Sequence, residues 1–402
     1  MPKQAKLRSR QGLRIKALAV AKLRADGLNQ LAIAERTGFS QPEVSRLLQR
    51  AIRDWQFLDP RPRFNANAAT PEDLAEAAGY YGAGSDHEEQ LRKAMVGGLP
   101  TRFHVHVLTT SLGHAADDRF SEQAALCLLE LLHRSKLVGV MCGRTLARIF
   151  GCVRSFEARS PIGAATDFIP ICGDPLHISH LAEAGYSASQ LAALLQAALG
   201  SKPSSELPTL AGVPAYLPRN LQFLGAVEQF IEGLPGYRVV FGKMRTRPSQ
   251  ALSQKLDTLI TGVGILAAAE DSIGGSTGAF IKERLLQGES NAAELASLLH
   301  GDIGGLLLGK EALTESQIRR VGQLNDGWTG LRLRELKDLA KRTKRSGAPG
   351  VVVIASGANK ADVVCEALRG SLVNELIIDR ELADAIVETL PKQRIHGCQP
   401  TR

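Results

Sequence analysis

Apolar residues follow two different spacings along this 402-residue chain. In the first 60 residues they recur at helical intervals, and Leu13, Leu18 and Leu23 mark that period. From about residue 100 onward, short β-rich runs alternate with helical stretches; the runs are 103–110, 137–142, 166–172, 256–264, 351–356 and 375–379. This alternation is typical of a mostly parallel sheet with helices on both faces.

The pattern therefore predicts an α/β protein in which an all-α N-terminal domain precedes a large Rossmann-like domain. A length of 402 residues exceeds what one hydrophobic core usually supports, so more than one domain is expected. We place the all-α domain at 1–60 and the α/β domain at 86–395. Residues 61–85 mix Pro, Asn, Ala and Gly, which favours a linker containing a short helix.

The segment 30–49, QLAIAERTGFSQPEVSRLLQ, has the residue spacing of a helix-turn-helix. Ala34 supplies the small residue needed where the two helices cross, and Gly38 supplies the positive φ of the tight turn. Ser40 is a good N-cap, and Pro42 and Glu43 follow it at the second and third positions, which predicts a capping box. The predicted apolar interface between the helices comprises Ile33, Phe39, Val44 and Leu47.

The second helix of this motif carries polar side chains suited to DNA. Gln and Arg have paired donors or acceptors that match adenine and guanine edges, whereas Ser45 and the remaining Arg suit phosphates. We expect operator DNA as the partner, and the predicted DNA-contacting residues are Ser40, Gln41, Glu43, Ser45, Arg46, Gln49 and Arg50. The alternative is an ordinary helical hairpin with a solvated polar face.

The distribution of charge supports the same interpretation. The chain has a net charge of +8, and residues 1–60 contain 12 Lys and Arg against 5 Asp and Glu. Most of the excess positive charge therefore belongs to the segment that is predicted to face a polyanion. A solvated basic arm is the alternative explanation.

Three loops that follow predicted strands are rich in glycine and in groups that bind anions. They are 143–145, 262–264 and 356–360. Glycines let backbone N–H groups approach an anion, while Thr145 adds a hydroxyl and Lys360 a positive charge. Because ligands bind outside the carboxyl ends of parallel strands, the three loops predict one composite site.

Several motifs in order along the chain resemble the SorC-type family of bacterial sugar-binding transcriptional regulators. They are EVSRLLQRA, VGVMCGRTL, LDTLITGVGI, HGDIGG, SGANKADVVCEALRG and VNELIIDRELA. The resemblance implies an effector domain shaped like the phosphosugar isomerases and a dimer or tetramer. It also implies that a sugar or sugar phosphate weakens or reshapes operator binding.

The resemblance also implies roles for particular residues. Gly143 and Thr145 look like a phosphate or hydroxyl cradle, and Lys360 looks like the cationic ligand contact. The whole predicted ligand-binding set is Gly143, Arg144, Thr145, Gly262, Gly264, Asp302, Gly357 and Lys360. Cys142 stands where the family commonly has tryptophan, and 265–267 lacks the arginine that some members use for a second phosphate, so the ligand itself stays open.

Other signals in the chain are weaker. The six cysteines form no CxxC pair, the N-terminus has no secretory signal, and no run is apolar enough to span a membrane. We therefore expect a cytoplasmic protein with reduced thiols, no membrane partner, no metal and no cofactor. The run 304–310, GGLLLGK, imitates a nucleotide-binding loop, but Glu311 stands where Ser or Thr must hold magnesium.

Two other functions remain open from the sequence. The chain could be a phosphosugar isomerase or deaminase whose N-terminal domain only mediates assembly, with an Asp such as Asp174 or Asp302 as general base. It could also bind nucleic acid nonspecifically beside a vestigial α/β domain. The outward Gln and Arg side chains of the second helix favour a regulator, which is not expected to be an enzyme.

Overall fold

The computed structural model describes residues 2–25, 28–58, 103–108, 116–157, 166–175, 186–200, 206–244, 248–266 and 277–393, with isolated positions at 89–91, 93 and 246. The chain divides into two compact units, residues 1–89 with 107–120 and residues 90–106 with 121–402. The predicted linker at 61–85 lies outside the described residues, and the domain boundaries stay predictions. No helix in the described ranges combines the length and the apolar character needed to cross a membrane.

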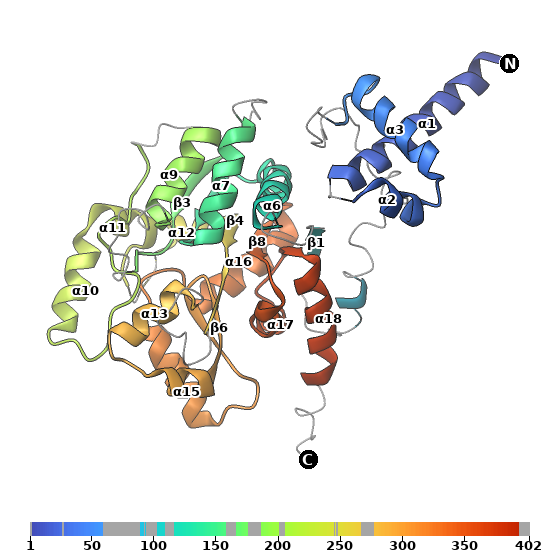
Figure 1. The fold of residues 1–402 in the computed structure, drawn as a ribbon. Coiled ribbons are helices and arrows are strands. Elements are labelled where there is room, and N and C mark those ends of the chain that lie inside the picture. Colours follow the sequence, from blue (N-terminus) through green and yellow to red (C-terminus); the bar gives the residue numbers. More distant parts are fainter. Residues whose placement is uncertain are drawn as a thin grey trace. The chain divides into compact units, whose positions relative to one another are not determined.

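Three helices form within residues 1–58 of the N-terminal unit (Figure 1); they are α1 (Pro2–Ala25), α2 (Gln30–Thr37) and α3 (Gln41–Arg53). Gly38 ends α2 with φ 70°, and its N–H donates to Ala34 O at 2.9 Å. Only glycine adopts this left-handed conformation without steric cost, so the turn residue was identified correctly. Leu18, Ile33, Val44 and Leu47 are buried in one core with neighbouring apolar residues.

The start of α3 departs from the sequence prediction in one respect. The Ser40 hydroxyl accepts a hydrogen bond from Glu43 N at 3.4 Å, as a capping residue should. The Glu43 carboxylate, however, lies 3.3 Å from Lys16 Nζ instead of returning to the Ser40 backbone N–H. A charged partner on α1 therefore takes the place of the second half of the capping box, because an ammonium attracts a carboxylate more strongly than a neutral amide does.

A six-stranded sheet forms the centre of the second unit. Its order is β1-β9-β8-β4-β2-β3, with β1 at His104–Leu108, β2 at Leu137–Val140, β3 at Asp167–Pro170, β4 at Thr258–Thr261, β8 at Gly350–Ala355 and β9 at Glu375–Asp379. The pairs β2/β3, β2/β4, β4/β8 and β8/β9 are parallel. Strands β4, β8 and β9 are buried along their whole length. The predicted mostly parallel α/β fold is therefore confirmed.

Helices precede or follow the strands of this sheet along the chain (Figure 1). They are α6 Ala116–Leu132, α7 Arg144–Glu157, α9 Ala188–Leu199, α16 Leu333–Ser346, α17 Ala361–Arg369 and, after the last strand, α18 Arg380–Gln393. A short 3₁₀ turn, η4 (Ala358–Lys360), leads into α17. Crossover helices of this kind are required between parallel strands, since a tight turn cannot return the chain to the same end of the sheet. Helices α7 and α17 thereby begin near the ends of β2 and β8.

A second, antiparallel sheet was not predicted. Its order is β5-β6-β7, with β5 at Val263–Ile265, β6 at Leu299–Ile303 and β7 at Leu306–Gly309. The prediction of a loop at 262–264 is therefore wrong in part. Only Gly262 lies between β4 and β5, whereas 263 and 264 belong to β5. Gly304 and Gly305, with φ 55° and 86°, form the two-residue turn between β6 and β7, so the run 304–310 is a hairpin and not a nucleotide-binding loop.

Further helices lie within residues 206–255 and beside the small sheet. The first group is α10 Leu224–Gly233, α11 Pro235–Phe241 and α12 Leu252–Lys255, and the second is α13 Ala279–Leu286, α14 Ala292–Leu298 and α15 Glu315–Asp326. Ile281, Leu295, Leu307 and Leu324 belong to one buried apolar cluster between α13, α14, β7 and α15. Tyr237 of α11 is buried, and its hydroxyl donates to Thr329 O at 3.2 Å. This bond ties α11 to the segment after α15.

Asn374 joins three elements in the buried interior of the large sheet. Its side-chain Oδ1 accepts from Val351 N at 2.9 Å, and its Nδ2 donates to Ala340 O at 3.0 Å. Its backbone carbonyl accepts from His104 N at 2.8 Å. The side chain thus satisfies backbone groups of β8 and α16 that would otherwise be buried without partners.

We predict that Asn374→Ala lowers the free energy of unfolding by about 2–4 kcal/mol, because two buried backbone groups lose their partners. Urea denaturation followed by circular dichroism measures the change. Asn220→Ala removes an exposed amide and should change the unfolding free energy by less than about 0.5 kcal/mol. Equal effects of the two substitutions would contradict this role of Asn374.

Candidate functional site

The polar side of α3 is presented to solvent. Gln41, Arg46, Gln49 and Arg50 are exposed, whereas Val44 and Leu47 on the opposite side of the helix are buried. Arg46 Nε donates to Pro42 O at 3.3 Å, one turn earlier in the same helix. A helix that buries one side and exposes Gln and Arg on the other has the form of a recognition helix.

Three of the seven predicted DNA-contacting residues have hydrogen-bond or ion-pair partners within the unit. Ser40 caps α3, Glu43 pairs with Lys16, and Arg46 donates to Pro42 O. Ser45 is half-buried on the same helix. The DNA-contacting roles of all seven residues stay predictions. Five of the seven are exposed; they are Ser40, Gln41, Arg46, Gln49 and Arg50.

The second unit contains a cavity of about 390 Å³ at the carboxyl ends of three neighbouring strands. Strands β8, β4 and β2 lie side by side in the sheet, so the loops that follow them converge. Seven of the eight predicted ligand residues line this cavity; they are Gly143, Arg144, Thr145, Gly262, Gly264, Asp302 and Lys360. The convergence of loops from residues 143, 262 and 360 was the main expectation for this domain, and the structure brings these residues together.

Gly357 does not line the cavity. Its N–H donates to Asp379 Oδ2 at 2.9 Å, and its φ of 92° is one that only glycine adopts readily. Asp379 Oδ1 also accepts from Leu382 N at 2.9 Å, which holds the β8–η4 turn against the start of α18. Gly357 therefore shapes the loop that places Lys360, and its own N–H is directed elsewhere.

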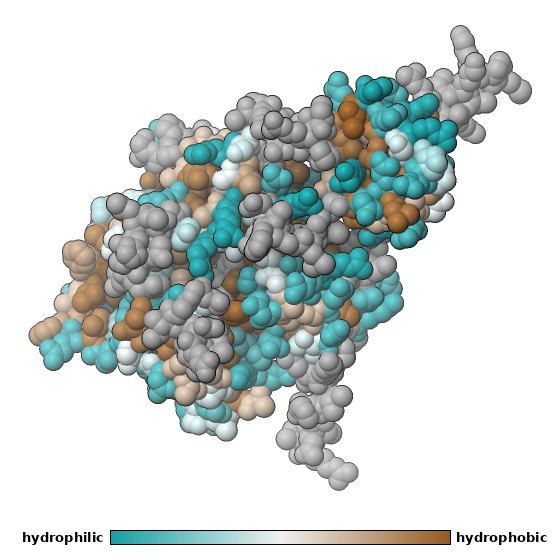
Figure 2. All heavy atoms as spheres, in the orientation of Figure 1, coloured by the Kyte–Doolittle hydropathy of each residue, from teal (hydrophilic) through white to brown (hydrophobic). Residues whose placement is uncertain are grey.

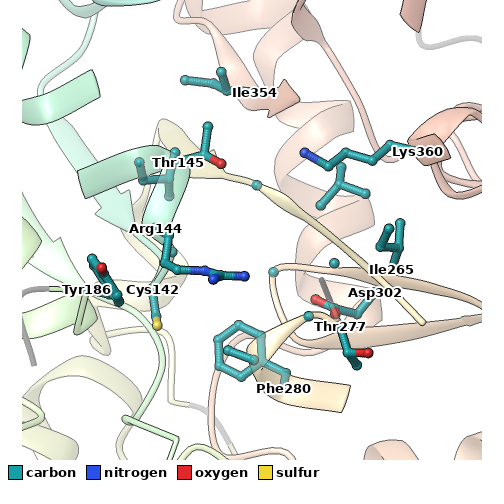
Figure 3. Close-up of a pocket in the computed structure, with 18 of the residues that line it drawn as sticks. Cys142, Arg144, Thr145, Tyr186, Ile265, Thr277, Phe280, Asp302, Ile354 and Lys360 are labelled. Carbon is teal, nitrogen blue, oxygen red and sulfur yellow. The ribbon is translucent and has the colours of Figure 1, made fainter. Parts of the chain in front are cut away.

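Positively charged side chains enter the cavity from different elements. Arg144 is the first residue of α7, and Lys360 immediately precedes α17. Figure 3 shows these two side chains entering from opposite sides, with the Lys360 ammonium directed toward Thr145. Lys282 of α13 also lines the cavity. Three cations around one cavity favour an anionic ligand.

Asp302 is the buried acid of the cavity and is 2% exposed. Its Oδ1 accepts from Gly305 N at 2.8 Å, whereas its buried Oδ2 has no hydrogen-bond partner. Burial raises the pKa of this carboxyl from 3.8 to about 6, and the Gly305 N–H and the charge of Arg284 act in the opposite direction. A buried oxygen without a partner is available to a hydroxyl or ammonium group of a ligand.

Glycines on neighbouring strands make room for this carboxylate. A Cβ on Gly264 would overlap Asp302 Oδ2, and a Cβ on Gly278 would lie 3.0 Å from the same oxygen. A Cβ on Gly301 would collide with Gly264 O. Glycine is therefore needed here because strand β5 and the start of α13 approach the carboxylate so closely.

A buried guanidinium lies below Asp302. Arg284 is fully buried and donates to Phe280 O at 2.8 Å, Gly305 O at 3.2 Å and Leu324 O at 3.4 Å. Its Cζ lies 4.3 Å from the centre of the Tyr216 ring. Burial lowers the pKa of this group to about 10, so it stays charged at neutral pH. Arg284 thus holds the turn after Asp302 and the start of α13 in fixed positions.

Two further acidic or thiol groups lie near the cavity. Cys142 lines it and is buried, and burial raises the pKa of its thiol, with Asp174 and Asp302 adding to the effect. Burial also raises the pKa of Asp174 to about 6. Within the described ranges no group of three or more His, Cys, Asp or Glu is arranged to hold a metal ion. His106 Nε2 of β1 lies 2.9 Å from Glu375 Oε2 of β9.

Several residues that line the cavity were not predicted from the sequence; they are Tyr186, Thr277, Phe280 and Lys282. Asn359, which also lines it, belongs to the predicted loop 356–360. Lys282 could have been found from its place four residues after Gly278, one turn into a helix that begins at a glycine. Tyr186 gave no signal, because it follows none of the loops that were considered. Its carbonyl accepts from Gly143 N at 3.1 Å, which fixes the loop after β2.

Comparisons with known proteins identify the fold. No family model matches the sequence, and no curated protein is significantly similar to it. Among solved structures, the full-length sorbitol operon regulator SorC from Klebsiella pneumoniae aligns with a TM-score of 0.53 and 18% identity, over 93% of this chain and 98% of SorC. The chain has the fold of SorC. A domain of a possible sugar-binding transcriptional regulator from Arthrobacter aurescens TC1 also has a TM-score of 0.53 at 18% identity, over 80% of this chain and all of that domain.

The likeness to SorC extends over both parts of the chain. At 93% coverage it includes the N-terminal helices as well as the α/β unit. The predicted resemblance to SorC-type regulators is thereby confirmed at the level of the fold.

The ionisation of Asp302 leads to a prediction about stability. Its pKa in the folded protein, about 6, lies above the ordinary 3.8, so the cost of burying the charge is absent below about pH 4 and complete above about pH 6. We predict that Asp302→Asn raises the free energy of unfolding relative to the wild type by up to about 3 kcal/mol at pH 8. The gain should shrink as the pH falls from 6 to 4.

Urea denaturation at several pH values between about 4 and 8 measures this difference. Asp338→Asn is the matched control, because Asp338 is exposed on α16. A pH-independent effect of Asp302→Asn would show that burial of the charge is not what distinguishes this carboxyl.

Proposed function

We propose that this protein is a DNA-binding transcriptional regulator whose operator binding is modulated by a sugar or sugar phosphate held in the cavity. The observation that carries the proposal is the coexistence of two features in one chain. An exposed Gln- and Arg-bearing helix lies in the N-terminal unit, and a polar cavity with three cations lies in the α/β unit. A regulator needs both a DNA-reading surface and a separate effector site.

The chemistry of the cavity supports a phosphorylated effector. Lys360 provides a point charge, and Thr145 provides a hydroxyl near the N-terminus of α7, where partial positive charge accumulates. Arg144 and Lys282 add positive charge from other directions. Asp302 supplies an acceptor for a sugar hydroxyl, because its buried Oδ2 has no partner. The cavity volume falls within the range of small-molecule sites.

Operator DNA and a homodimer or tetramer are the partners that this proposal requires. One helix-turn-helix reads too few base pairs for specificity in a genome, so two copies should bind half-sites spaced by whole helical turns. The solved proteins that share the fold are transcriptional regulators, which supports a role other than catalysis. A regulator should return its effector chemically unchanged, whereas an isomerase or deaminase would convert it.

We predict that Arg46→Ala and Gln49→Ala each weaken specific operator binding by about 1–3 kcal/mol, because these exposed side chains read base edges. The operator can be obtained by selection from random duplex DNA, and fluorescence anisotropy gives the affinities. Arg53→Ala removes a positive charge from the last turn of the same helix and should weaken operator and random DNA equally. Unchanged operator affinity for both base-reading variants would refute the assigned side of α3.

We predict that Lys360→Ala lowers effector affinity by at least about tenfold, since a charge-assisted bond to an anion contributes about 1.5–3 kcal/mol. Thr145→Val should lower it less, and neither change should affect operator binding without effector. A thermal-shift screen of sugars and sugar phosphates identifies the ligand, and calorimetry measures its affinity. Lys341→Ala, an exposed lysine of α16, is the control; wild-type affinity in the Lys360 variant would exclude this cavity as the effector site.

A further inference from the structure

A cysteine, a histidine and a glutamate of the α/β unit meet beside β1, the edge strand of the large sheet. Cys127 lies on α6, His106 on β1 and Glu375 at the start of β9. The effector cavity lies at the carboxyl ends of β2, β4 and β8. Because β8 and β9 are parallel, the start of β9 lies at the opposite end of the sheet. The three side chains therefore form a cluster that is separate from the effector cavity.

The Glu375 carboxylate is the buried member of this cluster. Figure 2 shows hydrophilic residues spread over the surface of the molecule, where charged side chains are normally solvated. The Glu375 side chain, in contrast, is 1% exposed. Its Oε2 lies 2.9 Å from His106 Nε2, and its Oε1 lies 3.5 Å from Arg134 Nη2. A carboxylate this deeply buried is stable only beside positive charge, which favours a protonated His106 ring.

The His106 ring has a second polar neighbour, the Cys127 thiol, with which it forms a hydrogen bond. Burial acts to lower the pKa of His106, but Cys127 and Glu375 outweigh burial and raise this pKa from 6.5 to about 10. The ring is therefore an imidazolium at neutral pH, and both of its nitrogens carry hydrogen. Glu375 accepts one N–H, which leaves the other N–H as the donor to the Cys127 sulfur.

A cation that donates to a cysteine sulfur promotes attack by that sulfur. The anionic sulfur is the nucleophile, and an adjacent imidazolium stabilises its negative charge. A third group that holds the imidazolium in place completes the arrangement by which proteins activate a nucleophile. Cys127, His106 and Glu375 contact one another in this order.

The other described cysteines differ from Cys127. Cys142, Cys172 and Cys365 are buried, and burial raises the pKa of each of these thiols. Thiols of this kind are inert. Cys152 of α7 is half-buried, as Cys127 is, so it is a reference with similar exposure.

We propose that Cys127 is a nucleophile that takes a small α,β-unsaturated carbonyl compound as a covalent adduct, with His106 as proton donor and Glu375 as the residue that positions His106. An addition reaction suits the cluster because the product needs a proton, which an imidazolium supplies. A substitution at carbon would need no such donor. The reagent must be small, since Cys127 is only partly exposed.

The addition balances within the cluster and its solvent. The sulfur forms a bond with the β-carbon while the carbon–carbon double bond becomes single, and the electron pair of that bond moves to the α-carbon. The α-carbon takes a proton from the His106 imidazolium. The proton that the thiol released to water then restores the imidazolium, so the thiol adds across the double bond without an oxidant or a leaving group.

The first test measures how fast each cysteine of the full-length protein reacts with acrylamide at pH 7, by mass spectrometry of tryptic peptides. Acrylamide is a small α,β-unsaturated carbonyl compound. Cys127 should react at least about tenfold faster than Cys152 in the folded protein. In urea the two cysteines should react at equal rates, because the contacts of the fold are lost. A rate for Cys127 in the folded protein no higher than that for Cys152 overturns the proposal.

The second test assigns the effect to the partners of Cys127. His106→Asn should lower the rate at Cys127 at least about tenfold and leave the rate at Cys152 unchanged. Glu375→Gln, which removes the charge behind the ring, should also lower the rate at Cys127. His104→Asn makes the same substitution at an exposed position of β1 and is the matched control. An unchanged rate at Cys127 in His106→Asn, or an equal loss in His104→Asn, overturns the proposal.

The buried cysteines report whether each variant is folded. Cys142, Cys172 and Cys365 should stay unreactive in a folded variant and should react once the chain unfolds. A structural role of His106 alone would expose these thiols together, whereas the proposed role changes the rate at Cys127 alone. If His106→Asn does not fold, the comparison of Glu375→Gln with the wild type decides, and an unchanged rate at Cys127 in folded Glu375→Gln then overturns the proposal.

Discussion

The buried guanidinium of Arg284 is the interaction on which the shape of the cavity depends. Each of its three hydrogen bonds goes to a backbone carbonyl, at Phe280, Gly305 and Leu324. Those carbonyls belong to α13, to the turn between β6 and β7, and to α15. A buried charged group is stable only when its donors have hydrogen-bond partners, so these three elements must keep their positions around Arg284.

This arrangement also sets the electrostatics of the cavity. The Gly305 N–H that donates to Asp302 belongs to the same residue whose carbonyl accepts from Arg284. The positive charge below the carboxyl opposes the rise in its pKa that burial causes. Asp302 therefore lies between a fixed cation inside the protein and the cations of the cavity, Arg144, Lys282 and Lys360. A ligand with an anionic group and a hydroxyl group can satisfy both kinds of partner at once.

Much of this site could be predicted from the sequence, because local residue patterns identify the strands and the loops that form it. Apolar runs identified β2, β4 and β8, and glycine-rich stretches after them identified Gly143, Gly262 and Lys360 as neighbours. Gly38 and the cap of α3 were found from local backbone requirements. These features depend on residues close together in the sequence.

The missed features depend on contacts between distant segments. The short strand β5 continues the apolar run that contains β4, and its separate pairing with the distant strand β6 leaves no local signal in the sequence. The Glu43 carboxylate turned to Lys16 on another helix, which no local rule predicts. The burial of Arg284 depends on α13, α15 and the β6–β7 turn meeting at one point, and a basic residue in a helix is normally read as exposed.

Packing inside the second unit connects the cavity with α11. Phe280 lines the cavity, and its ring packs edge-on against Trp328 with 4.8 Å between ring centres. The next residue, Thr329, accepts a hydrogen bond from Tyr237 of α11, the helix that follows α10. A ligand that displaces Phe280 must therefore either deform this buried contact or shift α11 with it.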